Sequence, residues 1–287
     1  MDDTNNVISS DDTASLQPYI DKYFKLLENF YHINKLKINP EKSRIMIVCR
    51  PAYRGESSNI VINTELKVIK QVQKLKALGM FITSGLSNHA NINHIISKVN
   101  YRLSILKGVF KFAEKRTKLI LINSLIISVF RYCSPLLIDS NCKMIDKLQT
   151  LLMKCTRRVL GFKSYKMSTV AIMRELKMVT IHHLVVKEAI QFVHKIIFNG
   201  GPKVIYKLFT LSRCNNPNIR GVRKPMMAKS HPSNAVNQSI FYRSIYLYNY
   251  LDYDIKMMNP KKLSKYLQQN IQYIFPNNRI FKVPRDQ

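Results

Sequence analysis

Two adjacent carboxylates, Asp2 and Asp3, are the first residues of this sequence whose chemistry calls for an explanation. Paired aspartates are commonly surface charges or helix caps, so the rest of the chain must decide whether these two do more. Lys42 follows a turn signal at Asn39-Pro40, where a lysine is commonly a surface residue.

The spacing of the cysteines and histidines gives little sign of a metal site. The five cysteines are widely spaced and two of the histidines are adjacent, which is more typical of buried or surface residues. None of the cysteines forms the close pair that a zinc site needs. His182 and His183 are neighbours and diverge if they lie on a helix, which favours core or surface roles. We expect reduced thiols in an intracellular protein of the nucleus or cytoplasm, because the polar N-terminus resembles no secretory signal.

The charge balance points to an anionic partner. Lys and Arg number 46 and Asp and Glu number 17, which gives a formal net charge of +29 on 287 residues. A chain with 46% hydrophobic residues buries a core, yet such a charge repels itself unless a polyanion offsets it. Nucleic acid is the first candidate, because neutralised phosphates release counterions. An anionic membrane surface is the second, although the apolar run at 119–130 is too short to span a bilayer.

The apolar periodicities predict an α+β fold, in which a small incomplete antiparallel sheet with helices precedes a mostly helical bundle. Strands are expected at 4–10 and 45–48, and further strands of a small sheet at 60–72 and 77–83, broken by Gly55 and Gly79. Helices are expected from Pro18 to Asn34, after Asn88, from Lys115 to Arg131, from Met144 to Leu160 with Gly161 as C-cap, and within 168–198. The chain turns polar from about residue 212 and closes with one or two aromatic-rich helices.

Cations flank the apolar face of the helix expected after Asn88. Those on its two edges are Lys98, Arg102, Lys107 and Lys111. Between residues 91 and 131 there are eight Lys or Arg and one acidic residue, Glu114. Such a run is often a solvated face, but this ratio exceeds ordinary pairing on a helix surface, so we expect phosphate contacts here.

In this order, the segments resemble the C-terminal part of a reverse transcriptase from a non-LTR (LINE-type) retrotransposon. Met1-Asp2-Asp3 is similar to the end of the family's aromatic-X-Asp-Asp hairpin, and LKINPEKSRIMI is similar to its next palm motif. KALGMFIT resembles the primer grip. The helical stretches NHIISKVNYRLSILKGV, INSLIISVFRYCSPLL and DKLQTLLMKCTRRVLG resemble the family's thumb helix and the two helices after it, and a basic aromatic tail ends the chain.

This resemblance, which covers essentially the whole chain, implies three regions. Residues 1–85 correspond to a partial palm, 86–211 to a helical thumb and connection, and 212–287 to the tail. Asp2 and Asp3 are implied to ligate Mg²⁺ (or Mn²⁺), and Lys42 to stabilise the leaving pyrophosphate. The implied partners are RNA and DNA as a template-primer duplex. The residues expected to contact it are Lys76, Lys98, Arg102, Lys107, Lys111 and Lys115.

Departures from the family pattern weaken the expectation of catalysis. A further palm aspartate, from a strand that precedes the hairpin in the family, has no counterpart in this sequence, so we expect neither stable metal binding nor polymerase activity from this chain alone. Ala77 replaces the usual aromatic before Leu78-Gly79, and Trp is absent. Two alternatives remain: a repurposed nucleic-acid-binding protein without catalysis, or a subunit that needs a separately encoded palm and fingers half. Membrane-surface binding is a third.

Overall fold

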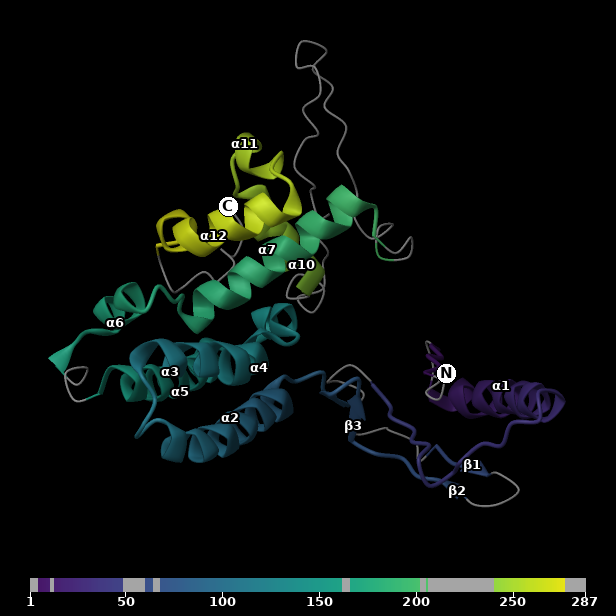
Figure 1. Cartoon of the computed structure of the whole chain (residues 1–287). Helices are drawn as coiled ribbons and strands as arrows, with labels where there is room; N and C mark the ends of the chain where they lie inside the picture. The colour runs from purple at the N-terminus through teal and green to yellow at the C-terminus, as the bar shows by residue number, and fades with distance from the viewer. Residues whose placement is uncertain are drawn as a thin grey trace, which may run out of the picture. The chain divides into compact units, whose positions relative to one another are not determined.

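The computed structural model describes residues 5–10, 13–48, 60–63, 68–161, 166–201, 205 and 240–276. The chain divides into two compact units, unit 1 from Met1 to Ala90 and unit 2 from Asn91 to Gln287. The described residues are mostly helical with two small antiparallel hairpins (Figure 1). The general α+β prediction is therefore confirmed.

Helix α1 (Thr13–Ile33) belongs to unit 1. It begins five residues before Pro18, so the proline lies inside the helix and removes one backbone donor there. Ile20 and Phe24 are buried on one side of α1. The amide of Gln17 donates to the carbonyl of Val61 at 2.9 Å and accepts from its N–H at 3.2 Å, which ties α1 to the segment before strand β1.

Two antiparallel hairpins occupy the region 60–83, where strands were predicted at 60–72 and 77–83. Strand β1 (Ile62–Asn63) pairs with β2 (Val68–Ile69), and β3 (Lys74–Ala77) pairs with β4 (Met80–Thr83). Leu78 and Gly79 both have positive φ, 46° and 79°. Positive φ at both central residues defines the tight hairpin turn that suits twisted strands. The chain therefore reverses at Leu78 and Gly79, where the sequence led us to expect a break at Gly79.

The other predicted strands are also corrected. In the stretch 45–48, only Ile45 pairs, through an isolated parallel bridge to Gln71. Residues 5–10, which fall in the first predicted strand, have no strand structure. Short apolar runs predict strands poorly because pairing needs a partner strand in register.

Unit 2 is a helical bundle. From residue 89 onward its described helices are α2 (His89–Val109), α3 (Lys115–Leu121), the π-helix η2 (Ile122–Ile127), α4 (Ser128–Arg131), the 3₁₀ helix η3 (Ser134–Asp139), α5 (Cys142–Leu160), α6 (Thr169–Glu175), α7 (Ile181–Asn199), α10 (Ile240–Asn249), α11 (Tyr253–Lys256) and α12 (Pro260–Ile274). Helix α7 packs against η3, α5, α10 and α12, and Figure 1 shows α10 and α12 beside it. Enclosure by these helices explains why α7 is buried nearly all round.

The helix predicted from Lys115 to Arg131 consists of α3, η2 and α4 in succession. Within it the hydroxyl of Ser124 donates to the carbonyl of Ile120 at 2.9 Å, so a side chain competes with the backbone for that acceptor. Ile122 and Phe130, from the apolar run, are buried in the core. Among the described residues no helix is long and apolar enough to cross a membrane.

One or two aromatic-rich helices were expected near the end of the chain, and within residues 240–276 the structure has α10, α11 and α12, which belong to unit 2. Helices α10 and α12 pack against α7, and Leu263, Leu267 and Ile271 of α12 are fully buried in the core of unit 2. Their spacing of four residues gives α12 one apolar face, which the bundle covers. Gly161 caps α5 as predicted, with φ 71° and ψ −157°, a backbone conformation reserved for glycine.

Candidate nucleic-acid interface

Helix α2 packs its apolar face inward and exposes its lysines. The buried face consists of Ile92, Ile95, Val99, Leu103 and Leu106. Lys98 and Lys107 of α2, and Lys111 in the turn after it, are exposed. Among the described residues none of these three ammonium groups has an ion-pair partner, so all three are available to phosphates.

Two other predicted phosphate contacts already have partners within unit 2. The half-buried Arg102 donates a hydrogen bond to the carbonyl of Leu125 in η2. Lys115 pairs with Glu175 of α6, with Nζ and Oε1 2.6 Å apart. Arg102 therefore joins α2 to η2. The Lys115–Glu175 pair is solvent-exposed, so it stabilises the fold little, but it partly neutralises Lys115 as a phosphate contact.

Lys76 lies in β3 and therefore belongs to unit 1, whereas the other predicted phosphate contacts belong to unit 2. It is exposed, and its ammonium lies 5.9 Å from the ring centroid of Phe81 on the paired strand. Lys74 lies over the same ring at 3.8 Å. Both lysines project toward one aromatic face, so this hairpin is a small cationic surface of unit 1.

Of the implied catalytic residues, Lys42 alone lies in the part of the chain that the structure describes. Asp2 and Asp3 lie outside the described residues. Lys42 is exposed in a turn where Asn39 Oδ1 accepts from the N–H groups of Glu41 and Lys42 at 3.0 and 3.3 Å. That side-chain-to-backbone bonding explains the turn signal at Asn39-Pro40. In the described part of the chain, no group of three or more His, Cys, Asp or Glu side chains could hold a metal ion.

A second row of lysines, which sequence analysis missed, lies on α5. Lys143, Lys147 and Lys154 are exposed, have no ion-pair partner among the described residues, and recur at steps of four and seven residues on the side opposite the core. We call these three residues the α5 basic stripe. The sequence did contain a pattern that predicts this stripe. The apolar residues of α5 recur every three or four positions, which leaves the lysines on the opposite face of the helix.

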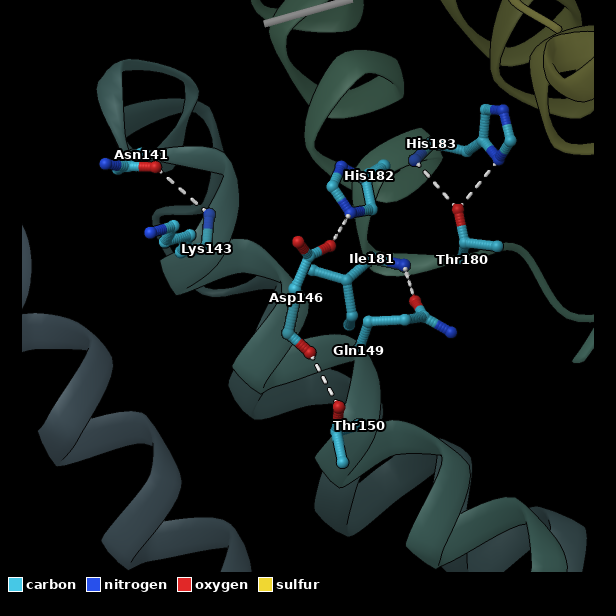
Figure 2. Close-up of polar contacts among 9 residues, drawn as sticks. All are labelled: Asn141, Lys143, Asp146, Gln149, Thr150, Thr180, Ile181, His182 and His183. Atoms are coloured by element: carbon cyan, nitrogen blue, oxygen red, sulfur yellow. Dashed lines mark hydrogen bonds and ion pairs between the residues drawn. The ribbon is translucent and has the colours of Figure 1, made fainter. Parts of the chain in front are cut away.

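Helix α5 is held in place by bonds at its first turns and to α7 (Figure 2). The Asn141 side chain caps α5 by accepting from Lys143 N–H at 3.1 Å. Asp146 Oδ1 lies 3.0 Å from Nε2 of the buried His182. Gln149 Oε1 accepts from the N–H of Ile181 at 2.8 Å, which satisfies an orphan donor at the start of α7. These contacts fix the orientation of α5 and so of its basic stripe.

Near the middle of α7 a buried lysine lies beside a single carboxylate. The side chain of Lys187 is 5% exposed; its Nζ donates to Gln268 Oε1 at 2.6 Å and lies 3.7 Å from Glu188 Oε1. Arg131 Nε lies 3.2 Å from the same Glu188 oxygen. Burial lowers the pKa of Lys187, and the Glu188 charge opposes that shift. The carboxylate of Glu188 therefore forms ion pairs with both Lys187 and Arg131.

Two buried histidines of α7 bind the C-terminal helices. His183 Nε2 lies 3.0 Å from the carbonyl of Phe275, and His194 Nε2 lies 2.9 Å from that of Met258. A carbonyl only accepts, so Nε2 carries the proton in both rings. Burial lowers the pKa of both histidines, against smaller raising effects of these carbonyls. His182 and His183 are both core residues, and the core was one of the two positions, core or surface, that the sequence left open.

Comparison with protein-family models, curated proteins and solved structures finds no significant match to this chain. Its function must therefore be inferred from its own residues and their geometry.

Proposed function

We propose that this protein binds nucleic acid through the cationic helices of unit 2. In this proposal it is a reverse-transcriptase-like fragment that holds a template-primer duplex of RNA and DNA without copying it. One observation carries the proposal: α2 and α5 expose lysines that no carboxylate of the described residues neutralises. These are Lys98, Lys107, Lys111, Lys143, Lys147 and Lys154.

The chemistry of such a surface suits a phosphate backbone. Lysine ammonium groups are point charges that neutralise phosphates, and each contact releases condensed counterions. Contacts of this kind set the position of a duplex but carry little sequence information. We therefore expect binding that is strong at low salt and largely indifferent to sequence.

The ordered resemblance to the non-LTR family supports the finer assignment. On that assignment, α1 and the hairpins of unit 1 correspond to the end of a palm with its primer grip, and α2 to α7 correspond to the thumb and connection. Its implied site residues are those named from the sequence, with Lys76 on the unit 1 hairpin and Lys98 on α2. The α5 basic stripe extends the proposed contact surface beyond them.

Changing Lys143, Lys147 and Lys154 together to glutamine tests the proposal. Three phosphate contacts contribute about 2.7 to the slope of log K against log salt, so the slope should fall by up to that amount. Affinity for a primed RNA–DNA duplex at about 0.1 M NaCl should fall by about a hundredfold. Fluorescence anisotropy titrations between about 50 and 200 mM NaCl measure both quantities.

A matched control is Lys261, Lys262 and Lys265 of α12, changed together to glutamine. These lysines are also exposed in unit 2, so the net charge falls equally. We expect this control to lose much less affinity than the α5 variant. Equal losses in the two variants, or binding that salt does not weaken, would contradict the proposed interface. Flotation with anionic liposomes tests the competing membrane surface.

We also expect the chain to bind a primed template without extending it in the presence of Mg²⁺ or Mn²⁺. The resemblance assigns no residue of this sequence to the further palm carboxylate, and a two-metal site needs it. Primer extension resolved on a gel, with an active reverse transcriptase as positive control, measures this directly. Primer extension above the level seen without the protein would contradict this part of the proposal.

The same assay separates the two remaining alternatives. If the chain is a subunit, co-expression with a separately encoded palm and fingers half should restore synthesis. If it is a repurposed binding protein, that half should leave synthesis at background while salt-sensitive binding persists. The replacement of the usual primer-grip aromatic by Ala77 favours the second outcome, because Ala77 offers no ring to stack or pack.

A further inference from the structure

Helix α1 carries a second apolar face, which the described residues of unit 1 leave largely exposed, although the Tyr23 hydroxyl donates to Asn6 Oδ1 at 3.0 Å. Ile20 and Phe24 face the core of the unit. On another side of the helix, five large apolar residues are 39–77% exposed. We call them the α1 stripe: Tyr19, Tyr23, Leu26, Phe30 and Ile33. Contiguous apolar patches of this kind mark interaction surfaces, whereas single exposed apolar residues need no explanation.

The spacing of the α1 stripe specifies the shape of the partner. Its members follow one another at steps of four, three, four and three residues from Tyr19 to the end of the helix at Ile33. That is the a/d repeat by which one helix packs knobs into the holes of another. A sheet or a flat surface needs no such repeat, so the spacing favours a second helix.

Charge and symmetry favour a second copy of α1 itself. The helix contains two acidic and two basic residues, Asp21, Glu28, Lys22 and Lys25, so it is electrically balanced in a chain of net charge +29. The α1 stripe is also nearly symmetric about Leu26. In an antiparallel pair, Leu26 meets its own copy, Tyr23 meets Phe30, and Tyr19 meets Ile33, which also pairs the helix dipoles favourably.

The exposed area is sufficient for a specific pair. If a large side chain offers about 200 Å², the exposed parts of the five amount to about 600 Å² on each helix. Two copies then bury about 1,200 Å² in total, the lower end of the range for stable interfaces. We propose that the protein forms a homodimer through an antiparallel pairing of the α1 stripe. This goes beyond nucleic-acid binding and does not depend on it.

Sedimentation equilibrium of the nuclease-treated full chain tests the dimer. At about 0.5 M NaCl charge repulsion between copies is screened within a few ångströms, so we expect twice the mass of one chain. Leu26→Asp places two like charges opposite each other at the centre of the pair, and the dissociation constant should rise at least about a hundredfold. Circular dichroism should be unchanged, because Leu26 is 62% exposed.

Ile105→Asp on α2 is the matched control, since Ile105 is 57% exposed and lies outside the α1 stripe. It should leave the dimer intact. Dissociation by both variants, by neither, or a monomeric native chain at about 50 µM would overturn the proposal. A native chain that stays monomeric is also what we would expect if unit 2 or a different protein covered the α1 stripe, and the homodimer proposal would then be wrong.

Cysteine cross-linking tests the orientation independently. Leu26→Cys should form a disulfide-linked dimer under mild oxidation, because Leu26 meets itself on the symmetry axis. Tyr19→Cys should cross-link only when it is mixed with Ile33→Cys. The native chain, oxidised in the same way, measures any cross-linking through the protein's own cysteines. Self-linking of Tyr19→Cys would mean a parallel pair and would overturn the antiparallel arrangement.

Discussion

Replacing Glu188 with glutamine should lower the free energy of unfolding by about 3 kcal/mol, whereas replacing Lys187 with methionine should change it by less than about 1 kcal/mol or raise it. The two residues are neighbours on α7, and the side chain of Lys187 is 5% exposed. Urea unfolding followed by circular dichroism measures both changes.

The asymmetry arises from the groups that each substitution leaves behind. Glutamine in place of Glu188 leaves the buried ammonium of Lys187 without its counter-charge, and it also releases Arg131, whose Nε lies 3.2 Å from that carboxylate. A buried charge that loses its partner typically costs about 3–5 kcal/mol, and the 18% exposure of Glu188 places this case at the lower end. Methionine removes the charge altogether and fills similar volume.

Lys187→Met leaves Gln268 without its donor, but Gln268 is only half-buried and can turn to water. Lys187→Gln, which is shorter and still polar, controls for the loss of packing and should cost more than methionine. If Glu188→Gln proved neutral while Lys187→Met strongly destabilised the protein, the lysine would be contributing through its charge, and the proposed balance would be wrong.

Lowering the pH below about 6.5 should progressively destabilise the protein through His183 and His194. Burial lowers the pKa of both histidines. Below the unfolded-state pKa, the unfolded chain therefore binds more protons at these positions than the folded chain does. Stability is therefore present above that pH and falls as the pH drops toward the folded pKa values. Two such groups contribute up to about 2.7 kcal/mol per pH unit.

Other titratable groups face this region and modify the profile. His182, which Asp146 contacts, neighbours His183 on α7 and its charge disfavours protonation of His183. Tyr248, whose phenol lies 3.2 Å from His194 Nδ1, has a pKa that burial raises to about 12. It therefore stays neutral throughout. Asp139 acts in the opposite direction, because burial raises its pKa to about 6 and folding then favours its protonated form.

Paired variants separate these contributions. In His183→Gln with His194→Gln, neither position titrates, so the free energy of unfolding should vary less between pH 7 and 5 than in the native protein. Asp139→Asn removes the opposing group and should steepen the native dependence below pH 6. Urea unfolding at each pH gives the profiles. A double variant with the native profile would show that the two histidines do not link α7 to the C-terminal helices through their neutral forms.

The helices of unit 2 were predictable to a large extent, and the small strands were not. Helix α2 followed from apolar residues at three- and four-residue steps, because that periodicity is local. The stretch KALGMFIT has an apolar composition typical of a strand. It forms the β3–β4 hairpin, with the break expected at Gly79, because Leu78 and Gly79 both adopt positive φ and the two halves pair with each other.

The candidate site was predictable in type but not in detail. A strongly cationic surface on α2 followed from the charge run, yet the same run includes Arg102, which bonds to Leu125, and Lys115, which pairs with Glu175. Both partners are distant in sequence, so no local pattern could reveal them. The α5 basic stripe was missed because its lysines are spread among apolar residues and form no run.

Sequence alone therefore determined the helical character of the described residues after 88, the apolar face of α2 and the end of α5 at Gly161, and the net charge led us to expect an anionic partner. These properties depend on neighbouring residues or on composition. Tertiary structure alone decided which lysines stay unpaired, how Lys187 and the histidines are buried, and that α10 to α12 pack on α7. Burial and pairing join residues far apart in the chain, and only packing brings those residues together.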